Sequence, residues 1–172
     1  MNNNELKIKK QEEYMAYIKE HRENVKKAFK FFIENNKIMQ STNREIQEAV
    51  LYLKNGIIDN HDNSKFSDEE FEPYRRYFYS INEIEKKSAE EDFNNAWKHH
   101  YEVNDHHPEH WIKDNVVTEM TMSAIIEMIC DWEAMAYKFG GSAKEWYEKN
   151  KNNIPLHVNT RSKLEYLLNI YQ

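Results

Sequence analysis

Residues 61–66 of the sequence read HDNSKF, and this segment begins with two side chains of the kind that bind metals. An imidazole nitrogen and a carboxylate oxygen together suit divalent transition metals such as zinc, iron or manganese. The carboxylate of Asp62 has two oxygens and is able to bridge two ions, and Lys65 places a positive charge three residues later. A His-Asp pair alone also occurs by chance in many proteins, so the prediction of a metal site depends on the ligands that other segments bring.

A histidine interrupts the first apolar series of the sequence. The spacings in this series are four and three residues, which place its members on one face of a helix. Its members are Tyr14, Ile18, His21, Val25, Ala28 and Phe32. His21 is therefore predicted to point toward the core, either as a core histidine with a hydrogen-bond partner or as a metal ligand.

A second apolar series contains a carboxylate. It runs through Val117, Thr121, Ala124, Met128, Asp131 and Met135. A buried carboxylate without a cation costs several kcal/mol or becomes protonated, so Asp131 needs a positively charged partner. That partner is either a basic side chain such as Arg22 or a metal ion, and the inward position of His21 makes a metal the more economical explanation.

The histidines of the sequence are concentrated in one region. Five of the eight lie between residues 99 and 110, which disfavours a solvated loop in which they are incidental. Phe93, Trp97 and His100 are spaced four and three residues apart, as on one face of a helix. His100 is therefore predicted to point inward, and it is preferred over His99 as a ligand.

These histidines predict a second metal ion. We expect His100 and one member of the His106-His107 pair to bind it, with Asp62 bridging the two ions. His107 is preferred over His106 because Pro108 restrains the backbone directly after it. Two ions about 3.5–4 Å apart would bind both the attacking and the leaving oxygen of a phosphate ester.

Helices are predicted to position these ligands. Four segments match a capping box, in which a serine or threonine covers backbone N–H groups and a glutamate three residues later reaches back. They are TNRE at 42–45, SDEE at 67–70, SAEE at 88–91 and SAKE at 142–145. Gly56 and the pair Gly140-Gly141 are candidate helix ends. The predicted helices cover residues 5–35, 43–56, 68–79, 88–103, 117–139, 142–150 and 160–171, with an irregular connection at 104–115.

The composition agrees with one all-α domain over residues 1–172. The length suits a single domain, and three glycines and three prolines are few for a sheet-rich fold with many tight turns. The formal charge of −6 disfavours binding to extended nucleic acid. No apolar run of about 18 residues predicts a membrane span. The single cysteine, Cys130, fits a reducing cytoplasm, which is the expected location.

The ordered set His21, His61-Asp62 and Asp131 resembles the ligand signature of the HD-domain metal-dependent phosphohydrolases. The resemblance implies an all-α, single-domain helical bundle of HD-domain type in which these four side chains bind one ion. The segment HDNSK is also similar to the His-Asp-x-x-Lys form of the phosphodiesterase branch, where the lysine assists phosphate chemistry. More closely, HRENV, HDNSKFS, FEPYRRYF, WKHH and CDWEAM together resemble a small, largely uncharacterised family of bacterial and phage proteins of this type.

This resemblance implies a phosphohydrolase that acts on a phosphate mono- or diester, with a nucleotide as the expected small substrate. One or two ions of Mn, Fe, Zn, Ni or Co would activate water, Asp62 would bridge or orient it, and Lys65 would stabilise the phosphoryl group or the leaving oxygen. Arg75 and Arg76 are candidate phosphate clamps, although exposed helix charges are an equal explanation. The segment HHPEHW replaces the Gly-Tyr-Pro segment of the phosphodiesterase branch, so specificity for cyclic dinucleotides is not implied.

Two other classes of function stay open. Some proteins similar to HD-domain enzymes hold a diiron centre and oxidise small molecules with O₂, and six or more His and Asp ligands would suit that centre as well. Alternatively, the metal holds helices together in a non-catalytic module whose FEPYRRYFYS surface binds a protein partner. The sequence also leaves oligomerisation and the identity of the metal open.

Overall fold

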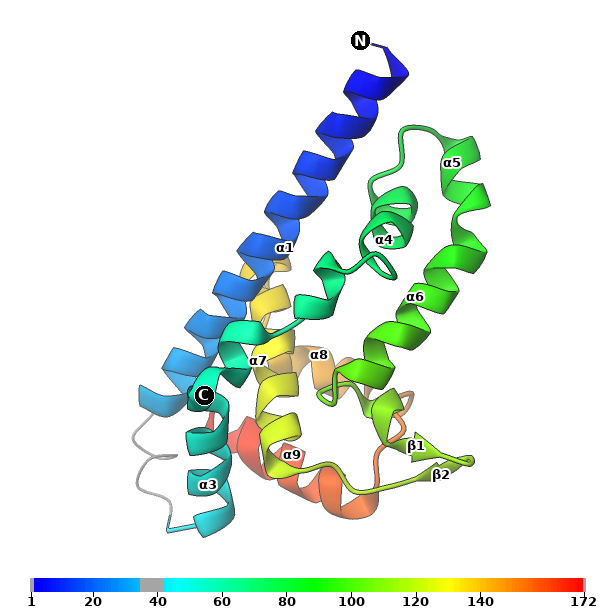
Figure 1. Ribbon diagram of the computed structural model, residues 1–172. Coiled ribbons are helices and arrows are strands. Elements are labelled where there is room, and N and C mark those ends of the chain that lie inside the picture. The colour runs from blue at the N-terminus through cyan, green and yellow to red at the C-terminus, as the bar shows by residue number, and fades with distance from the viewer. Residues whose placement is uncertain (1, 35–41, 172) are drawn as a thin grey trace. The chain divides into compact units, whose positions relative to one another are not determined.

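The computed structural model describes residues 2–34 and 42–171, and these residues form an all-α structure, as the sequence predicts (Figure 1). The helices are α1 (Asn3–Glu34), α3 (Arg44–Tyr52), α4 (Phe71–Phe78), α5 (Glu83–Ser88), α6 (Glu90–Val103), α7 (Met122–Phe139), α8 (Ala143–Asn150) and α9 (Val158–Ile170). Shorter helical turns occupy Leu53–Ile57, Ile58–Asn60, Asn63–Phe66 and Pro108–Trp111. In the described part of the chain, no helix is long and apolar enough to cross a membrane.

The chain divides into two compact units, each with an apolar core of its own. Unit 1 comprises Met1–Glu20 and Asp62–Val103, and unit 2 comprises His21–His61 and Asn104–Gln172. The peptide bond between His61 and Asp62 is therefore a point at which the chain passes from one unit to the other. The prediction of one domain over residues 1–172 stays a prediction.

Unit 2 is built around α7, which packs against α3, α8 and α9 (Figure 1). The predicted apolar series on α1 continues into this core, where His21 is 5% exposed and Val25, Ala28 and Phe32 are fully buried. Burying a Val or Phe side chain stabilises the fold by about 1.5–3 kcal/mol. The residues that must be buried therefore fix the rotation of α1 and hold His21 on its inner face.

The start of α7 differs from the prediction of a helix over residues 117–139. Val117 lies in β2 (Val116–Val117), which pairs antiparallel with β1 (Ile112–Lys113). Asp114 and Asn115 join the strands with φ of 50° and 62°, the left-handed backbone that short polar residues adopt in tight hairpin turns. Thr121 is the N-cap of α7, because its side chain accepts a hydrogen bond from the Ala124 N–H at 3.2 Å. The apolar helical series therefore begins after Thr121.

Unit 1 has an aromatic core between α1 and the helices α4 and α6. Tyr14, Ile18, Tyr74 and Ala96 are its buried members. The rings of Tyr14 and Tyr74 are nearly parallel, with centroids 6.5 Å apart. The helix α5, which the sequence did not predict, packs against α4 and α6.

The predicted capping boxes have mixed outcomes. Ser142 caps α8, because its side chain accepts from the Glu145 N–H at 3.2 Å. Asn43, rather than Thr42, caps α3 and accepts from the N–H groups of Glu45 and Ile46. The other two boxes are wrong, because α4 begins only at Phe71 and the Ser88 hydroxyl donates back to the Glu85 carbonyl at the end of α5.

The predicted helix ends are marked by left-handed backbone. Gly140 ends α7 with φ of 89°, as predicted. Gly56 has φ of 97° but lies inside the turn Leu53–Ile57, and helical turns continue after it toward His61. The predicted end of the first helix at residue 35 lies outside the described residues.

Candidate metal centre

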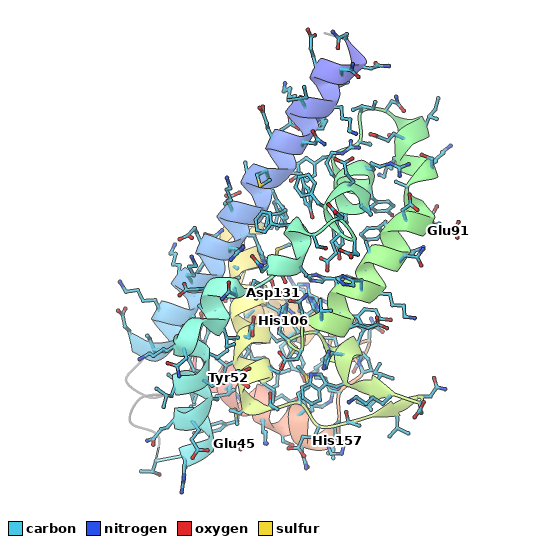
Figure 2. All side chains as sticks on the ribbon, viewed as in Figure 1. Glu45, Tyr52, Glu91, His106, Asp131 and His157 are labelled. Atoms are coloured by element: carbon cyan, nitrogen blue, oxygen red, sulfur yellow. The ribbon has the colours of Figure 1, made fainter. Side chains whose placement is uncertain are left out.

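Three polar side chains of unit 2 converge from three separate segments. His21 comes from α1, His61 follows the turn Ile58–Asn60, and Asp131, which Figure 2 labels, comes from α7. The Nε2 atom of His21 lies 3.0 Å from Oδ1 of Asp131, and the Nε2 atom of His61 lies 3.8 Å from the same oxygen. The two imidazole rings have centroids 5.5 Å apart. The sequence prediction that His21, His61 and Asp131 come together agrees with this geometry.

The spacing of these donor atoms fits a transition metal ion. Ligand atoms that lie about 2.1 Å from zinc are separated by about 3.0 Å at a right angle and about 3.4 Å at the tetrahedral angle. The observed separations of 3.0 and 3.8 Å lie close to these values, and all three donor atoms lie within 4.8 Å of one another. Two imidazole nitrogens and one carboxylate oxygen are a donor set that such ions prefer over calcium or magnesium.

Asp131 is ionised in this environment. Burial on its own raises the pKa of the carboxyl group, but the contact with His21 at 3.0 Å and the neighbouring His61 lower it well below its usual range. The carboxylate is therefore in the form that a metal requires. Arg22, the alternative cation considered from the sequence, donates to the carbonyl oxygen of Asp59 at 2.5 Å.

A buried glutamate that the sequence reasoning missed lies beside this group. Glu127 is on α7, four residues and about one helical turn before Asp131, and it is 4% exposed. Its Oε1 atom lies 2.8 Å from Nδ1 of His61 and 3.5 Å from Nδ1 of His106. The spacing of four residues inside the apolar segment IIEMICD was the signal for Glu127. His61, His106 and Glu127 form a second group of possible metal ligands within unit 2.

Unit 1 contains a separate chain of buried polar contacts around Asp62. The backbone of Asp62 is left-handed, with φ of 54°, and its side chain is 2% exposed. Lys65 donates to its Oδ2 atom at 2.6 Å, and the Nε2 atom of His100 lies 3.3 Å from its Oδ1 atom. His100 is 1% exposed whereas the side chain of His99 is 36% exposed, so the predicted inward position of His100 is confirmed.

Glu70 is the second buried glutamate that the sequence reasoning missed. It is fully buried, and its two oxygens accept from Nδ1 of His99 and Nδ1 of His100, each at 2.8 Å. Burial alone lowers the pKa of His100, but the hydrogen bond and charge of Asp62, helped by Glu70, raise it. Burial likewise raises the pKa of Glu70, but its hydrogen bond with His100 lowers it overall. The sequence offered a misleading signal here, because Glu70 occupies the last position of an apparent capping box.

Several predicted ligands belong to different units. Asp62 and His100 lie in unit 1, whereas His107 lies in unit 2. Their predicted second ion, and the predicted sharing of the first ion by Asp62, therefore stay predictions. Within unit 2, His106 is the member of the His106-His107 pair that is fully buried and contacts Glu127, whereas His107 is half-buried.

The two arginines predicted as phosphate clamps have structural partners instead. Arg75 is fully buried and donates to Glu85 at 2.7 and 3.0 Å and to Glu72 at 3.1 Å. Arg76 donates to Asp92 at 2.7 Å. The explanation of Arg75 as an exposed helix charge is therefore wrong, and its guanidinium is engaged by two glutamates.

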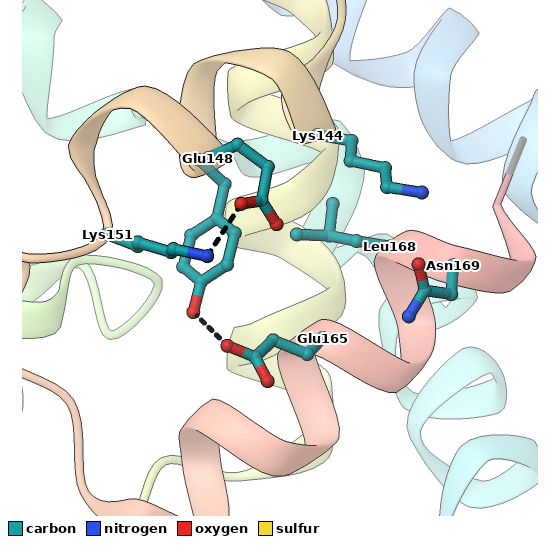
Figure 3. Close-up of a pocket in the computed structure, with 7 residues that line it drawn as sticks. Lys144, Glu148, Lys151, Glu165, Leu168 and Asn169 are labelled. Atoms are coloured by element: carbon teal, nitrogen blue, oxygen red, sulfur yellow. Dashed lines mark hydrogen bonds and ion pairs between the residues drawn. The ribbon is translucent and has the colours of Figure 1, made fainter.

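A small pocket of about 160 Å³ lies between α8 and α9 of unit 2 (Figure 3). Four of its lining residues form hydrogen bonds or ion pairs with each other. Lys151 donates to Glu148 at 2.7 Å, and the Tyr147 hydroxyl donates to Glu165 at 2.8 Å. The pocket is therefore lined by one ion pair and one tyrosine–glutamate hydrogen bond, and by none of the His and Asp residues of the metal centre.

The comparison with known protein families covers almost the whole chain. Residues 10–170 match the model of a family of unknown function, DUF5662. The chain belongs to this family. No curated protein and no solved structure matches it. The DUF5662 match spans every ligand predicted from the sequence, and the function of the family is unknown.

Proposed function

We propose that this DUF5662 protein is a metal-dependent phosphohydrolase whose ion is held in unit 2 by His21, His61 and Asp131. The observation that carries the proposal is the shared oxygen of Asp131, which lies 3.0 and 3.8 Å from the Nε2 atoms of the two histidines. The order of these residues along the chain resembles that of the HD-domain phosphohydrolases. A divalent ion bound there would polarise a phosphate oxygen and make water more acidic.

The chain's own residues have distinct tasks in this proposal. The Asp131 carboxylate supplies a negative charge, which its contact with His21 helps to keep ionised. Asp62, joined to His61 by a peptide bond, is the proposed acceptor of a hydrogen bond from the attacking water. Lys65, the ion-pair partner of Asp62, is the proposed cation for the phosphoryl oxygens. Both are the proposed catalytic residues.

The proposed substrate is a small phosphate mono- or diester, such as a nucleotide, rather than a long polyanion. The formal charge of −6 disfavours binding to extended nucleic acid. Arg75 and Arg76 are engaged with Glu85 and Asp92, so Lys65 carries the proposed electrostatic role.

The test combines metal analysis with a substrate panel. The protein is purified without chelators, its metal content is measured by mass spectrometry, and phosphate mono- and diesters are assayed with Mn, Fe, Zn, Ni and Co. We expect metal-dependent release of product, with metal content and turnover both lost in Asp131→Ala and His21→Gln. The control is His157→Asn, because the imidazole of His157 caps α9 by accepting from the Asn159 N–H and asparagine preserves that role.

Other outcomes contradict the proposal in distinguishable ways. Turnover that is unchanged in Asp131→Ala would show that catalysis does not use this centre. Oxygen consumption by the iron-loaded protein without phosphate release would identify an oxygenase. Metal binding that raises the melting temperature without turnover of any ester would identify a metal that only holds the helices together.

A further inference from the structure

Each unit contains a buried glutamate that contacts two histidines. In unit 2, Glu127 accepts from Nδ1 of His61 at 2.8 Å and lies 3.5 Å from Nδ1 of His106. In unit 1, Glu70 accepts from Nδ1 of both His99 and His100 at 2.8 Å. Neither glutamate has a role in the hydrolysis proposed above, yet burying a carboxylate costs several kcal/mol unless it is well paired.

The contacts of Glu127 determine where His61 carries its proton. A neutral imidazole has one N–H group and one nitrogen with a lone pair. The carboxylate of Glu127 only accepts hydrogen bonds, so it holds the proton of His61 on Nδ1. The lone pair of neutral His61 is then on Nε2, which is the atom 3.8 Å from Oδ1 of Asp131.

Unit 1 repeats the same arrangement with different residues. Glu70 holds Nδ1 of His100, and the Nε2 atom of His100 lies 3.3 Å from Oδ1 of Asp62. In both units a fully buried histidine therefore lies between a glutamate at Nδ1 and an aspartate near Nε2. Histidines that bind metals commonly donate their second ring nitrogen to a carboxylate in this way, which fixes the ring and increases the basicity of the ligand atom.

We propose that Glu127 is a positioning residue that fixes His61 in the Nδ1–H tautomer and directs its Nε2 lone pair toward the metal centre. This inference rests on the proposed metal centre, since an orienting carboxylate has a function only if the histidine binds an ion. It also excludes Glu127 as a direct ligand of that ion, although Glu127 belongs to a possible ligand group with His61 and His106.

The first test reads the tautomer in metal-free protein, so it does not depend on catalysis. Long-range ¹H–¹⁵N correlation spectra of histidine-labelled protein are recorded at a pH where the imidazoles are neutral. We expect His61 in the Nδ1–H form in the wild type and in Glu127→Gln, because the glutamine oxygen still accepts from Nδ1–H. We expect a mixture with the Nε2–H form in Glu127→Leu, which has no acceptor. A wild-type His61 in the Nε2–H form would overturn the proposal.

The second test measures zinc affinity and stoichiometry by titration calorimetry. Loss of an orienting carboxylate typically weakens metal binding 10–100-fold, and we expect about this loss in Glu127→Leu and a smaller one in Glu127→Gln. The number of ions per chain at saturation should stay that of the wild type. The matched control is Glu119→Gln, which makes the same change at a half-buried residue paired with Asn159 and Lys163 before α7. The control should bind zinc as the wild type does.

The outcomes separate this inference from the proposed function. If Glu127→Gln binds fewer ions at saturation, Glu127 is a ligand and the positioning role is wrong. If Glu127→Leu folds and binds zinc with the affinity of the control, the positioning role is also wrong. If Glu127→Leu fails to fold, the tautomer of wild-type His61 decides the question. If the wild type binds no ion at all, the proposal of a metal centre is wrong. The tautomer of His61 then reports only a structural hydrogen bond with Glu127. If tautomer and affinity behave as expected but no ester is hydrolysed, the positioning role stands without the proposed activity.

Discussion

The Nε2 atom of His21 lies 3.0 Å from Oδ1 of Asp131, and this contact joins the inner face of α1 to the inner face of α7. In the absence of an ion, the two side chains satisfy each other. An ion between them would replace one hydrogen bond by two coordinate bonds, so binding should stabilise the fold. The first prediction follows from this exchange.

We predict that zinc or manganese raises the melting temperature of the wild type. An ion at 100 times its dissociation constant stabilises the folded state by about 2.7 kcal/mol, which corresponds to roughly 5–10 °C in a chain of this size. Asp131→Leu should lose this shift but keep or exceed the metal-free stability of the wild type, because an apolar side chain avoids burying a charge. Differential scanning calorimetry with and without the ion measures both effects. A shift of equal size in Asp131→Leu would remove Asp131 from the site.

A second prediction concerns the ion pair between the buried Arg75 and the partly buried Glu85. Burial raises the pKa of Glu85, but the hydrogen bond and charge of Arg75 lower it overall below its usual value of 4.5. Such a carboxylate stabilises the fold above the unfolded pKa, and this contribution is lost as the pH falls through the folded pKa. Glu85→Gln should therefore cost about 3 kcal/mol at neutral pH, the lower end for breaking a buried pair, since Glu72 still contacts Arg75.

The difference between Glu85→Gln and the wild type should shrink below pH 4.5, as Glu85 of the wild type becomes protonated. Urea denaturation across pH 3–7 measures it. Glu83→Gln is the control, because Glu83 is exposed on the same helix α5. A pH-independent difference would show that packing, rather than the charge of Glu85, is responsible.

A third prediction tests the left-handed backbone of Asp62, whose φ is 54°. An alanine in this conformation costs about 1–2 kcal/mol, whereas a glycine adopts it without strain. Both Asp62→Gly and Asp62→Ala lose the ion pair with Lys65. The glycine variant should therefore be more stable than the alanine variant by about 1 kcal/mol in chemical denaturation. Equal stability would mean that the backbone at this position relaxes.

A fourth prediction distinguishes the two candidate caps of α3. Asn43 accepts hydrogen bonds from the N–H groups of Glu45 and Ile46 at 2.9 and 3.4 Å. Asn43→Ala should destabilise the protein by about 1 kcal/mol, a typical cost for removing a cap. Thr42→Ala should have little effect, since the sequence match to a capping box gives Thr42 no cap in the structure. A larger loss in Thr42→Ala would restore the original prediction.

The sequence revealed the ligands that interrupt a regular apolar pattern. The burial of His21 could be predicted because apolar residues define the inner face of α1, and the burial of His100 could be predicted in the same way on α6. Asp131 was visible for this reason as well, although two members of its series lie outside α7. The helix boundaries before α4 and α6 were less predictable, because a serine or threonine near a glutamate caps a helix only if the backbone between them is helical.

The buried glutamates were harder to find for a different reason. A glutamate in a helix usually faces solvent, and its burial depends on a histidine supplied by another segment. The hydrogen-bond partner of Glu127 is His61, which follows the turn Ile58–Asn60. The partner of Glu70 is His100 on α6. The spacing of Glu127 from Asp131 indicated a buried glutamate, but the identity of its histidine partner is a property of the tertiary structure.

The single cysteine of the chain is completely buried on α7, directly before Asp131. Burial raises the pKa of the Cys130 thiol well above its usual range, so the thiol is inert while the helix stays packed. A thiol reagent therefore modifies Cys130 only when α7 opens locally, and the modification rate measures how often that happens. An ion that binds α1 and α7 together would slow this rate, so the native protein carries its own kinetic reporter of metal occupancy.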